Sequence, residues 1–589
     1  MASTSNQQSP VIPIQFPRME VKQCNRVRSA HLQFRKSLTP GTGRRLHAEV
    51  DAAPGKLLAR IQKPLLNIVK KGCIETTCDN CLATHRQGGA MDGICSSTVS
   101  SDGISRPQDM VACDGCKFLH YCSEKCKNEA WANHHKAECS VLDKLVKEGW
   151  REDAAIESEL LRVVIRLFCL RATGDEYESV FENLKSLPEY NQLTRVAMLC
   201  WDSDDIENFA IQCGLLRRYE GMGDGDGEAN GENGGFENEG FVQGREDIKH
   251  IYIAMETHGI DIAHPKINID GLTEHHESYI VTGTCFDFCT SKINHSCAPN
   301  CIWVFNKSEL QLRAVKNIRE GEELTVSYDA YAGAREENYS RGTVKSHWNG
   351  NAHKKRVKKL KERWGFECAC TLCLGAKYQP FWHTKGSHID DLVQPLFKKA
   401  TYPPPQPIDE LPKLLRLLTI ASEENFSLQS FPMKTIHERI RTHQANSRQL
   451  IEALRTSLKL YILVETQYFI PLPLDQRLSS LRILSEYYER YTQFLNLPHL
   501  TEDLYVRLFG LKLKLVRETE MCFGRDSDIA IFLRKTLAAE IQAVKVNATR
   551  TKLDLGLVEV RFAVEMKGML NRAGFDEEQI KKAKICEIL

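Results

Sequence analysis

Short-spaced cysteine and histidine pairs are the side chains of this 589-residue sequence best suited to metal chemistry. Four pairs fall between residues 73 and 139: Cys78 with Cys81, Cys113 with Cys116, Cys122 with Cys126, and His135 with Cys139. Tetrahedral zinc takes four thiolate or imidazole ligands per ion, so these eight side chains predict two closed sites. His134, the neighbour of His135, is the fallback ligand. Closed sites favour a structural or partner-docking role over a hydrolytic one.

Three later segments carry a second group of candidate residues. They are Asn294-His295-Ser296-Cys297-Ala298-Pro299-Asn300, Gly321-Glu322-Glu323-Leu324-Thr325-Val326-Ser327-Tyr328, and Phe366-Glu367-Cys368-Ala369-Cys370-Thr371-Leu372-Cys373. The last segment supplies three thiolates, one fewer than a closed zinc site needs. A tyrosine at the end of a strand is more often part of a core than a catalyst, so each segment alone is a modest signal. Their order along one chain is the informative feature.

Together these segments resemble the SET domain of protein-lysine methyltransferases, and residues 121–139 resemble a MYND zinc finger. With the finger placed between two β-rich blocks, the chain resembles the SET and MYND domain family. The resemblance implies three zinc ions held by interleaved ligands. The implied sets are Cys78, Cys81, Cys122 and Cys126; Cys113, Cys116, His135 and Cys139; and Cys297, Cys368, Cys370 and Cys373.

The same resemblance implies that S-adenosylmethionine donates a methyl group to lysine side chains of histone or non-histone proteins. The implied cofactor-binding residues are Gly41, Gly43, Arg44, Asn294, His295, Tyr328 and Phe366, and Tyr328 is also the catalytic residue. Arg45 departs from the pattern because the family tends to have glycine there. Either its side chain points outward, or it reduces the affinity for the cofactor.

The chemistry of such a transfer sets its own requirements. Methyl transfer from a sulfonium to an amine is an in-line displacement, so nitrogen, methyl carbon and sulfur must be aligned and the lysine must be uncharged. Burial in an apolar channel with aromatic walls lowers the pKa of an ammonium group and helps it lose a proton to water. A strong general base is therefore not required.

The elements that position these residues predict an α+β, multi-domain chain. Helical stripes of apolar residues at three- and four-residue spacing alternate with short strand-like runs, which include one near Ile251 and a small β-meander between Leu32 and Ile68. The predicted segments are a disordered terminus (1–30), a first SET part (31–72), the finger (73–139) with an inserted loop (87–108), a helical insertion (140–218), a Gly-rich acidic linker (219–246), a second SET part (247–335), a basic helix with a post-SET zinc segment (336–375), and an α-helical, repeat-like carboxy-terminal domain (376–589).

Composition narrows the function classes. A net charge of +1 argues against a globally basic nucleic-acid binder, and no apolar run is long enough to cross a bilayer. The amino terminus lacks a secretory pattern, which predicts an intracellular chain with reduced cysteines, placed in the cytoplasm and nucleus. We expect a monomer without membrane contact. The basic run 354–361 favours the solvated face of a helix, with Val357, Leu360 and Trp364 on the opposite face, over nuclear import or polyanion contact.

Two other function classes compete with the enzyme. One is a MYND scaffold that recruits proline-rich partners, possessing a SET core that has lost cofactor binding. The other is weak nucleic-acid binding through the finger and the basic helix, which would require strongly salt-dependent binding to random duplex. A cofactor-binding assay separates the scaffold from the enzyme.

Overall fold

The structure is a computed structural model that describes residues 32–36, 44–84, 110–147, 159–173, 177–185, 187, 239–265, 279–297, 299–328, 351–370, 373–374, 410–423, 431–465, 474–494, 502–547, 555–583 and 585–586. The predictions for the terminus 1–30, the inserted loop 87–108, Gly41 and Gly43 lie outside these residues.

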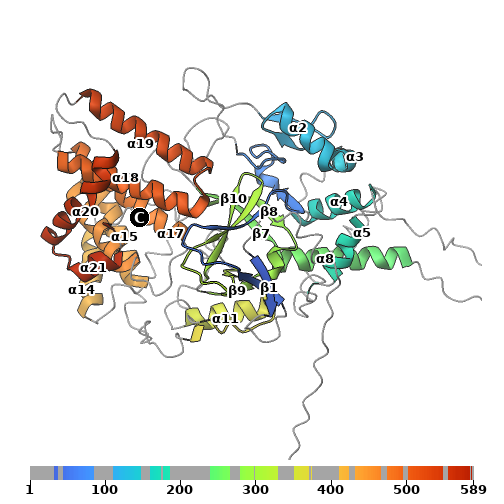
Figure 1. Cartoon of the computed structure of the whole chain (residues 1–589), viewed down its shortest axis with the longest axis horizontal. Helices are drawn as coiled ribbons and strands as arrows, with labels where there is room; N and C mark the ends of the chain where they lie inside the picture. The colour runs from blue at the N-terminus through green and yellow to red at the C-terminus, as the bar shows by residue number, and fades with distance from the viewer. Residues whose placement is uncertain are drawn as a thin grey trace, which may run out of the picture.

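The central β-structure is built from short strands that lie on both sides of the finger in sequence (Figure 1). Their bounds are β1 (Leu32–Lys36), β2 (Arg44–Ala48), β3 (Leu57–Ile61), β4 (Leu66–Val69), β7 (Ile260–Pro265), β8 (Tyr279–Phe286), β9 (Asn294–His295), β10 (Cys301–Asn306), β11 (Glu309–Ala314) and β12 (Thr325–Val326). One sheet has the order β10-β11-β3 and another the order β4-β8-β7. Strands β9 and β12 pair in parallel, and β1 pairs with β2.

The predicted β-meander is wrong: of the strands described between Leu32 and Val69, β1 and β2 pair with each other, whereas β3 and β4 do not join them. Strand β3 instead pairs with β11, and β4 pairs with β8, so the two halves of the split domain share their sheets. These strands are deeply buried: Leu58, Ile61 and Ile68 are at most 1% exposed, and the strands hydrogen-bonded beside them come from the second half. Burial of one apolar face fixes the register of such a strand, because a shift by one residue would expose its apolar side chains.

The finger packs as a compact appendage above the sheets (Figure 1). Its elements are β5 (Val111–Ala112), β6 (His120–Tyr121), α2 (Glu124–Ala130), the π-helical turn η3 (Trp131–His135) and α3 (Lys136–Lys147); a 3-10 turn, η2 (Lys71–Cys73), precedes it. Helix α2 begins at a serine cap, since the Ser123 hydroxyl accepts a hydrogen bond from the Cys126 N–H at 3.3 Å. This cap sets the direction in which Cys126 faces its neighbours.

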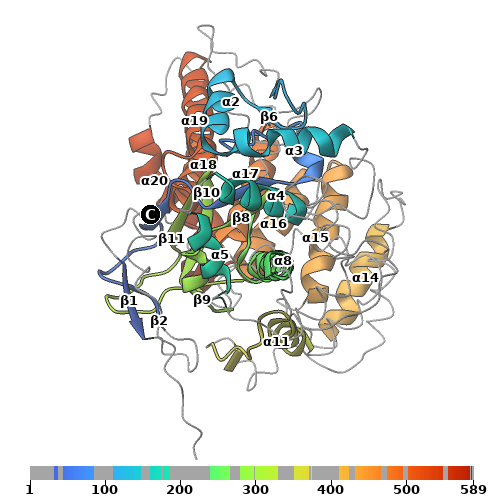
Figure 2. The same cartoon turned by 90° about the vertical axis from the view of Figure 1, so that its right-hand side faces the viewer.

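Three helices lie against the sheets on the side of the finger: α4 (Glu159–Arg171), α5 (Glu178–Lys185) and α8 (Glu239–His258) (Figures 1 and 2). The strand expected near Ile251 is wrong, because Ile251 lies within α8 and is 1% exposed. Helix α8 also begins at Glu239, so the last part of the predicted linker, 239–246, is helical. The apolar run from Ile251 to Ala254 is too short to distinguish a buried helix from a strand by periodicity.

The remaining elements are helical apart from the turn η6 (Thr290–Lys292). Helix α11 (Asn351–Trp364) covers the basic run, and Leu360 and Trp364 are buried on its opposite face, as the solvated-face interpretation predicts. The carboxy-terminal helices are α14 (Glu410–Glu423), α15 (Phe431–Asn446), α16 (Leu450–Lys459), η8 (Leu460–Glu465), α17 (Leu474–Phe494), α18 (Glu502–Phe523), α19 (Asp528–Asn547), α20 (Leu555–Arg572) and α21 (Glu577–Ala583). Their apolar core includes Ala263 of β7 and Val304 of β10, which joins the helices to the sheets.

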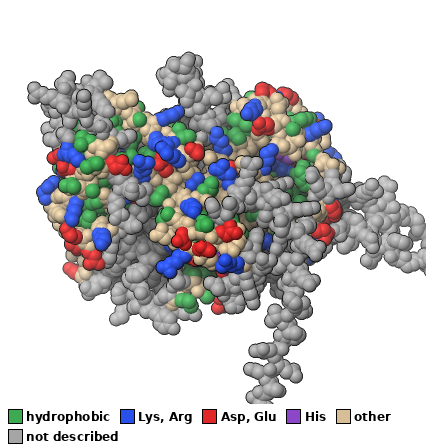
Figure 3. All heavy atoms as spheres, viewed as in Figure 1, with side chains coloured by type: hydrophobic (Ala, Val, Ile, Leu, Met, Phe, Trp, Pro, Cys, Tyr) green, Lys and Arg blue, Asp and Glu red, His purple; other side chains and the backbone are tan. Residues whose placement is uncertain are grey.

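The surface carries both signs of charge. On the face drawn in Figure 3, basic and acidic side chains are interspersed over the described elements, in keeping with the net charge of +1. Within the described part of the chain, no helix has the length and apolar character that crossing a membrane requires.

Helices α18 and α20 approach closely at Gly510. A Cβ at this position would lie 2.6 Å from Cε2 of the fully buried Phe562 ring and closer still to its Cδ2 and Cγ. We expect Gly510→Ala to lower the free energy of unfolding by about 3 kcal/mol, because the core must move to admit the methyl group. Urea denaturation measures the change. Gly568→Ala on α20 is the control, because its Cβ would meet only Arg572 Nη1 at 3.6 Å, and a destabilisation equal to that of Gly510→Ala would contradict the packing argument.

Candidate active site and metal centres

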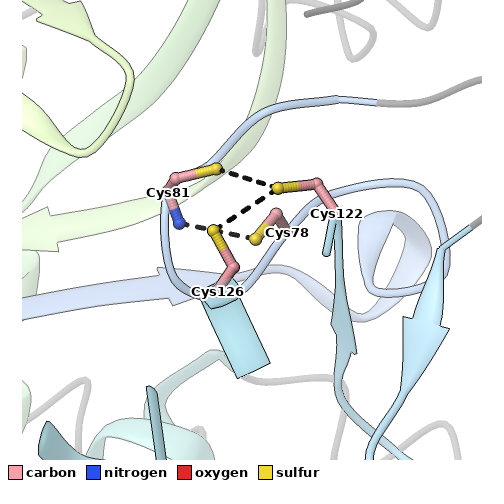
Figure 4. A group of neighbouring side chains, drawn as sticks. All are labelled: Cys78, Cys81, Cys122 and Cys126. Atoms are coloured by element: carbon pink, nitrogen blue, oxygen red, sulfur yellow. Dashed lines mark hydrogen bonds between the residues drawn. The ribbon is translucent and has the colours of Figure 1, made fainter. Parts of the chain in front are cut away.

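Four cysteines of the finger converge on one another (Figure 4). They are Cys78, Cys81, Cys122 and Cys126, and all four sulfurs lie within 4.8 Å of one another. The Cys122 sulfur is 3.5 Å from that of Cys81 and 3.4 Å from that of Cys126. Sulfurs bound to one tetrahedral zinc are separated by ~3.8 Å, given a Zn–S bond of about 2.3 Å. The donor set and its spacing therefore fit zinc.

A second group combines three cysteines with one imidazole: Cys113, Cys116, His135 and Cys139. The His135 Nε2 is 3.0 Å from the Cys113 sulfur and 3.7 Å from that of Cys116. His134 does not join these sulfurs; its Nε2 lies 3.3 Å from Oδ2 of Asp79. Burial alone would raise the pKa of Cys113, but the Cys116 N–H and His135 lower it to about 7, which favours the thiolate that a metal needs.

The third group joins a cysteine after β9 to three cysteines after α11. Its members are Cys297, Cys368, Cys370 and Cys373. The Cys297 sulfur lies 3.5 Å from that of Cys373 and 3.8 Å from that of Cys368. Its hydrogen bond also lowers the pKa of Cys370 to about 5. The structure thus places a fourth sulfur beside the three of 368–373, so this group could hold a metal ion.

Asn294, His295 and Tyr328 lie together where β9 pairs in parallel with β12. The Tyr328 N–H donates to Nδ1 of His295 at 3.0 Å, and the Tyr328 hydroxyl donates to the Ile293 carbonyl at 2.7 Å. The other ring nitrogen of His295 lies 3.1 Å from the Cys297 sulfur. His295 therefore connects the tyrosine with the third cysteine group.

Aromatic rings gather around Tyr328. Ring centroids lie 5.3 Å apart for His295 and Tyr328, 6.3 Å for Tyr328 and Phe366, and 5.9 Å for His295 and Phe366. Trp364 is a site residue that the sequence analysis missed: its ring is 5.5 Å from that of Tyr328, and its indole N–H donates to the Thr257 carbonyl at 2.8 Å. The sequence placed Trp364 on the apolar face of a helix and gave no sign of its contact with Tyr328. These rings form an aromatic wall at the end of β12.

Arg45 points inward, to Asn294. Its Nε donates to Oδ1 of Asn294 at 2.8 Å, while Nδ2 of Asn294 donates to Oε1 of Glu323 at 2.6 Å. The outward-pointing alternative is therefore excluded. The neighbouring Arg44 is described only as part of the β2 backbone, opposite Lys36.

His258 feels the positive charges of Arg45 and Lys292. Burial, together with the charges of Arg45 and Lys292, lowers the pKa of His258 to about 3, so this imidazole at the end of α8 is neutral at pH 7. No sequence motif marked His258. The Asn294 amide, the aromatic wall and these charges bring polar and apolar groups together, a combination typical of small-molecule sites.

The amino-acid sequence of this chain is similar to those of known proteins. The SET domain family matches residues 43–329. The chain is 27% identical over 343 residues to histone-lysine N-methyltransferase SMYD3 of Mus musculus, a stretch that covers 58% of this chain and 61% of that protein. It is 22% identical over 486 residues to histone-lysine N-methyltransferase ASHR1 of Arabidopsis thaliana, covering 80% and 82%.

The mouse and human SMYD3 proteins are each matched over about three fifths of their length. Another relative, from Schizosaccharomyces pombe, is named SET domain and MYND-type zinc finger protein 6 and is 22% identical over 216 residues, covering 37% of this chain and 34% of that protein. The SET match spans both sequence halves of the interleaved sheets, and the finger between them carries two of the cysteine groups. On this evidence the chain contains a region similar to the SET domain and resembles SET and MYND domain proteins over much of its length.

Proposed function

We propose that this chain is a protein-lysine N-methyltransferase that uses S-adenosylmethionine. The observation that carries the proposal is the meeting of Asn294, His295 and Tyr328 beside the aromatic rings of Trp364 and Phe366. The names of the relatives, histone-lysine N-methyltransferases, support the same activity.

The residues present fit the cofactor. Asn294 and His295 are proposed to bind its polar end, Phe366 to face the adenine, and Arg44, Gly41 and Gly43 to complete the binding loop. When bound, S-adenosylmethionine supplies an activated methyl group on a sulfonium. The chain's own contribution is to align the acceptor with that group.

The acceptor lysine is proposed to enter against the aromatic wall. The rings of Tyr328, Trp364 and Phe366 exclude water and favour the neutral amine over the ammonium ion. The Tyr328 hydroxyl, held by the Ile293 carbonyl, keeps its ring at a fixed angle to this wall. Deprotonation can then proceed to water without a protein base.

Zinc is proposed at all three cysteine groups, two in the finger and one behind the active site, because each donor set matches a closed tetrahedral site. The substrates are proposed to be histones, by analogy with the relatives' names, or non-histone proteins, and the protein is proposed to reside in the nucleus and the cytoplasm. The finger remains a candidate docking site for proline-rich peptides, and we propose that the protein acts as a monomer.

Labelled methyl transfer tests the activity. Zinc-replete protein is incubated with methyl-labelled S-adenosylmethionine, core histones and total cell protein, and label on lysine is measured. We expect Tyr328→Phe to slow transfer about fivefold, because it removes one hydrogen bond that fixes the ring, worth about 1 kcal/mol. Tyr505→Phe, in α18 and outside the site, should leave the rate unchanged.

Absence of label is also informative. Suppose that zinc-replete wild-type protein neither transfers the methyl group nor binds S-adenosylmethionine in calorimetry. That result would refute the proposed methyltransferase activity and favour a scaffold that recruits proline-rich partners. Label that Tyr328→Phe leaves undiminished would refute the role proposed for this tyrosine while retaining the activity.

A further inference from the structure

A buried group of charged side chains joins the finger to the sheets. It consists of Asp79, His134 and Glu138 from the finger and Arg162 and Arg166 from α4. All but His134 expose 6% or less of their surface. Charges buried to this degree must be paired to be tolerated, so the arrangement of partners is tightly constrained.

Arg166 stands at the centre of this group. Its Nε and Nη2 make two parallel bonds to the Glu138 carboxylate, at 3.0 and 2.7 Å. Nη2 also reaches Oδ2 of Asp79 at 2.8 Å, and Nη1 donates to the Asn67 carbonyl in β4 at 2.9 Å. One guanidinium therefore binds two segments of the finger and one strand of the sheet.

Glu138 in turn faces a proposed metal ligand. The Nε2 atom of His135 is directed at the sulfurs of Cys113 and Cys116, while its Nδ1 lies 3.5 Å from Oε1 of Glu138. Among the described residues, this buried Nδ1 has no hydrogen-bond partner at standard geometry. A carboxylate beside the outer nitrogen of a metal-binding histidine fixes the tautomer and orientation of its ring.

Asp79, His134 and Glu138 could in principle hold a further metal ion, since their ligand atoms lie within 4.8 Å of one another. The two arginines argue against it. Arg162 Nη2 is 3.0 Å from Oδ1 of Asp79, and Arg166 pairs with both carboxylates. The two positive and two negative charges balance, so a cation would have to displace a guanidinium.

We propose that Arg166 is a positioning residue for the metal site of Cys113, Cys116, His135 and Cys139. It holds Glu138 against His135 and anchors the site to β4, so that retention of this metal depends on contact with the SET sheets. The inference rests on the zinc assignment in the proposed function and is independent of methyl transfer. The finger is accordingly part of one cooperative unit rather than a separate module.

Zinc release tests the proposal with a readout other than activity. Full-length, zinc-loaded protein is mixed with a chromogenic chelator, and the rate of each release phase is recorded. Arg166→Lys keeps one positive charge but cannot span Glu138, Asp79 and the Asn67 carbonyl together. We expect it to speed release of one zinc ion per chain about tenfold, with the other phases unchanged.

Two further variants identify the affected release phase and control for the substitution of an arginine in α4. Cys116→Ser identifies the phase that belongs to the His135 site, because that phase should be missing. Arg171→Lys is the matched control on the same helix: its partners are Glu178 and Asp247, away from the finger, and we expect wild-type release. Release from Arg166→Lys within twofold of wild type would overturn the proposal.

A charge-balanced variant guards against misfolding. Arg166→Met combined with Glu138→Gln removes one charge of each sign and leaves Asp79 paired with Arg162. We expect this double variant to fold and still to lose the same zinc ion faster than wild type. Equal acceleration of every release phase would instead indicate general destabilisation, and it would overturn the assignment to Arg166. Wild-type protein that carries no zinc would refute the zinc assignment itself, an outcome distinct from either.

Discussion

Replacing Cys297 with serine is expected to remove one zinc ion per chain and to weaken S-adenosylmethionine binding about a hundredfold. Cys297 supplies the fourth sulfur to a group whose other members follow α11, and its sulfur lies 3.5 Å from that of Cys373. Without it, the 368–373 segment retains three thiolates and no closed site. The segment is then no longer fastened to β9.

The loss should reach the cofactor through two routes. Phe366 lies two residues before Cys368, so its ring is released from the aromatic wall when the segment detaches. His295 also loses a neighbour, because its ring nitrogen is 3.1 Å from the Cys297 sulfur. The remaining metal sites lie in the finger and should be unaffected.

Metal analysis and isothermal titration calorimetry measure the two effects on the same sample. Cys73→Ser is the matched control, since Cys73 is half-buried and lies outside all three groups. A Cys297→Ser protein with an unchanged zinc content and cofactor affinity would contradict the assignment of Cys297 as a ligand.

Arg45→Met is expected to weaken binding of S-adenosylmethionine about thirtyfold. The substitution keeps the length of the side chain and removes the donor that reaches Oδ1 of Asn294 at 2.8 Å. A hydrogen bond from a charged donor contributes about 2 kcal/mol, and Asn294 would be left with Glu323 as the side-chain partner shown at its other amide atom. The amide would then lose its fixed orientation before the cofactor binds.

Calorimetry on the purified variant checks this expectation. Arg35→Met is the control: Arg35 lies opposite Arg45 in the register of β1 and β2, and its side chain is exposed. Arg45→Gly separates positioning from crowding: glycine removes both the donor and the bulk. Tighter binding by Arg45→Gly would show that Arg45 obstructs the cofactor, which is the reverse of the positioning role.

Local features of this protein could be predicted from residue spacing. Ligand pairs such as Cys78 with Cys81 lie within one turn of chain, so their spacing alone keeps the two sulfurs near each other. Helical stripes such as Leu504 to Leu515 likewise depend only on neighbours three and four residues apart, and α18 forms there. Resemblance to a known family extended these local signals to the interleaved ligand sets and to Asn294, His295 and Tyr328.

Tertiary structure alone decided the long-range contacts. The pairing of β3 with β11, the reach of Arg45 to Asn294 across 249 residues, and the approach of Trp364 to Tyr328 have no local signature. Arg166 is the clearest case, since an arginine in an apolar stripe gives no indication that it will meet Glu138 and Asp79. Such contacts depend on which apolar faces must be buried against each other, and burial is settled by the packing of the whole chain rather than by the spacing of neighbours.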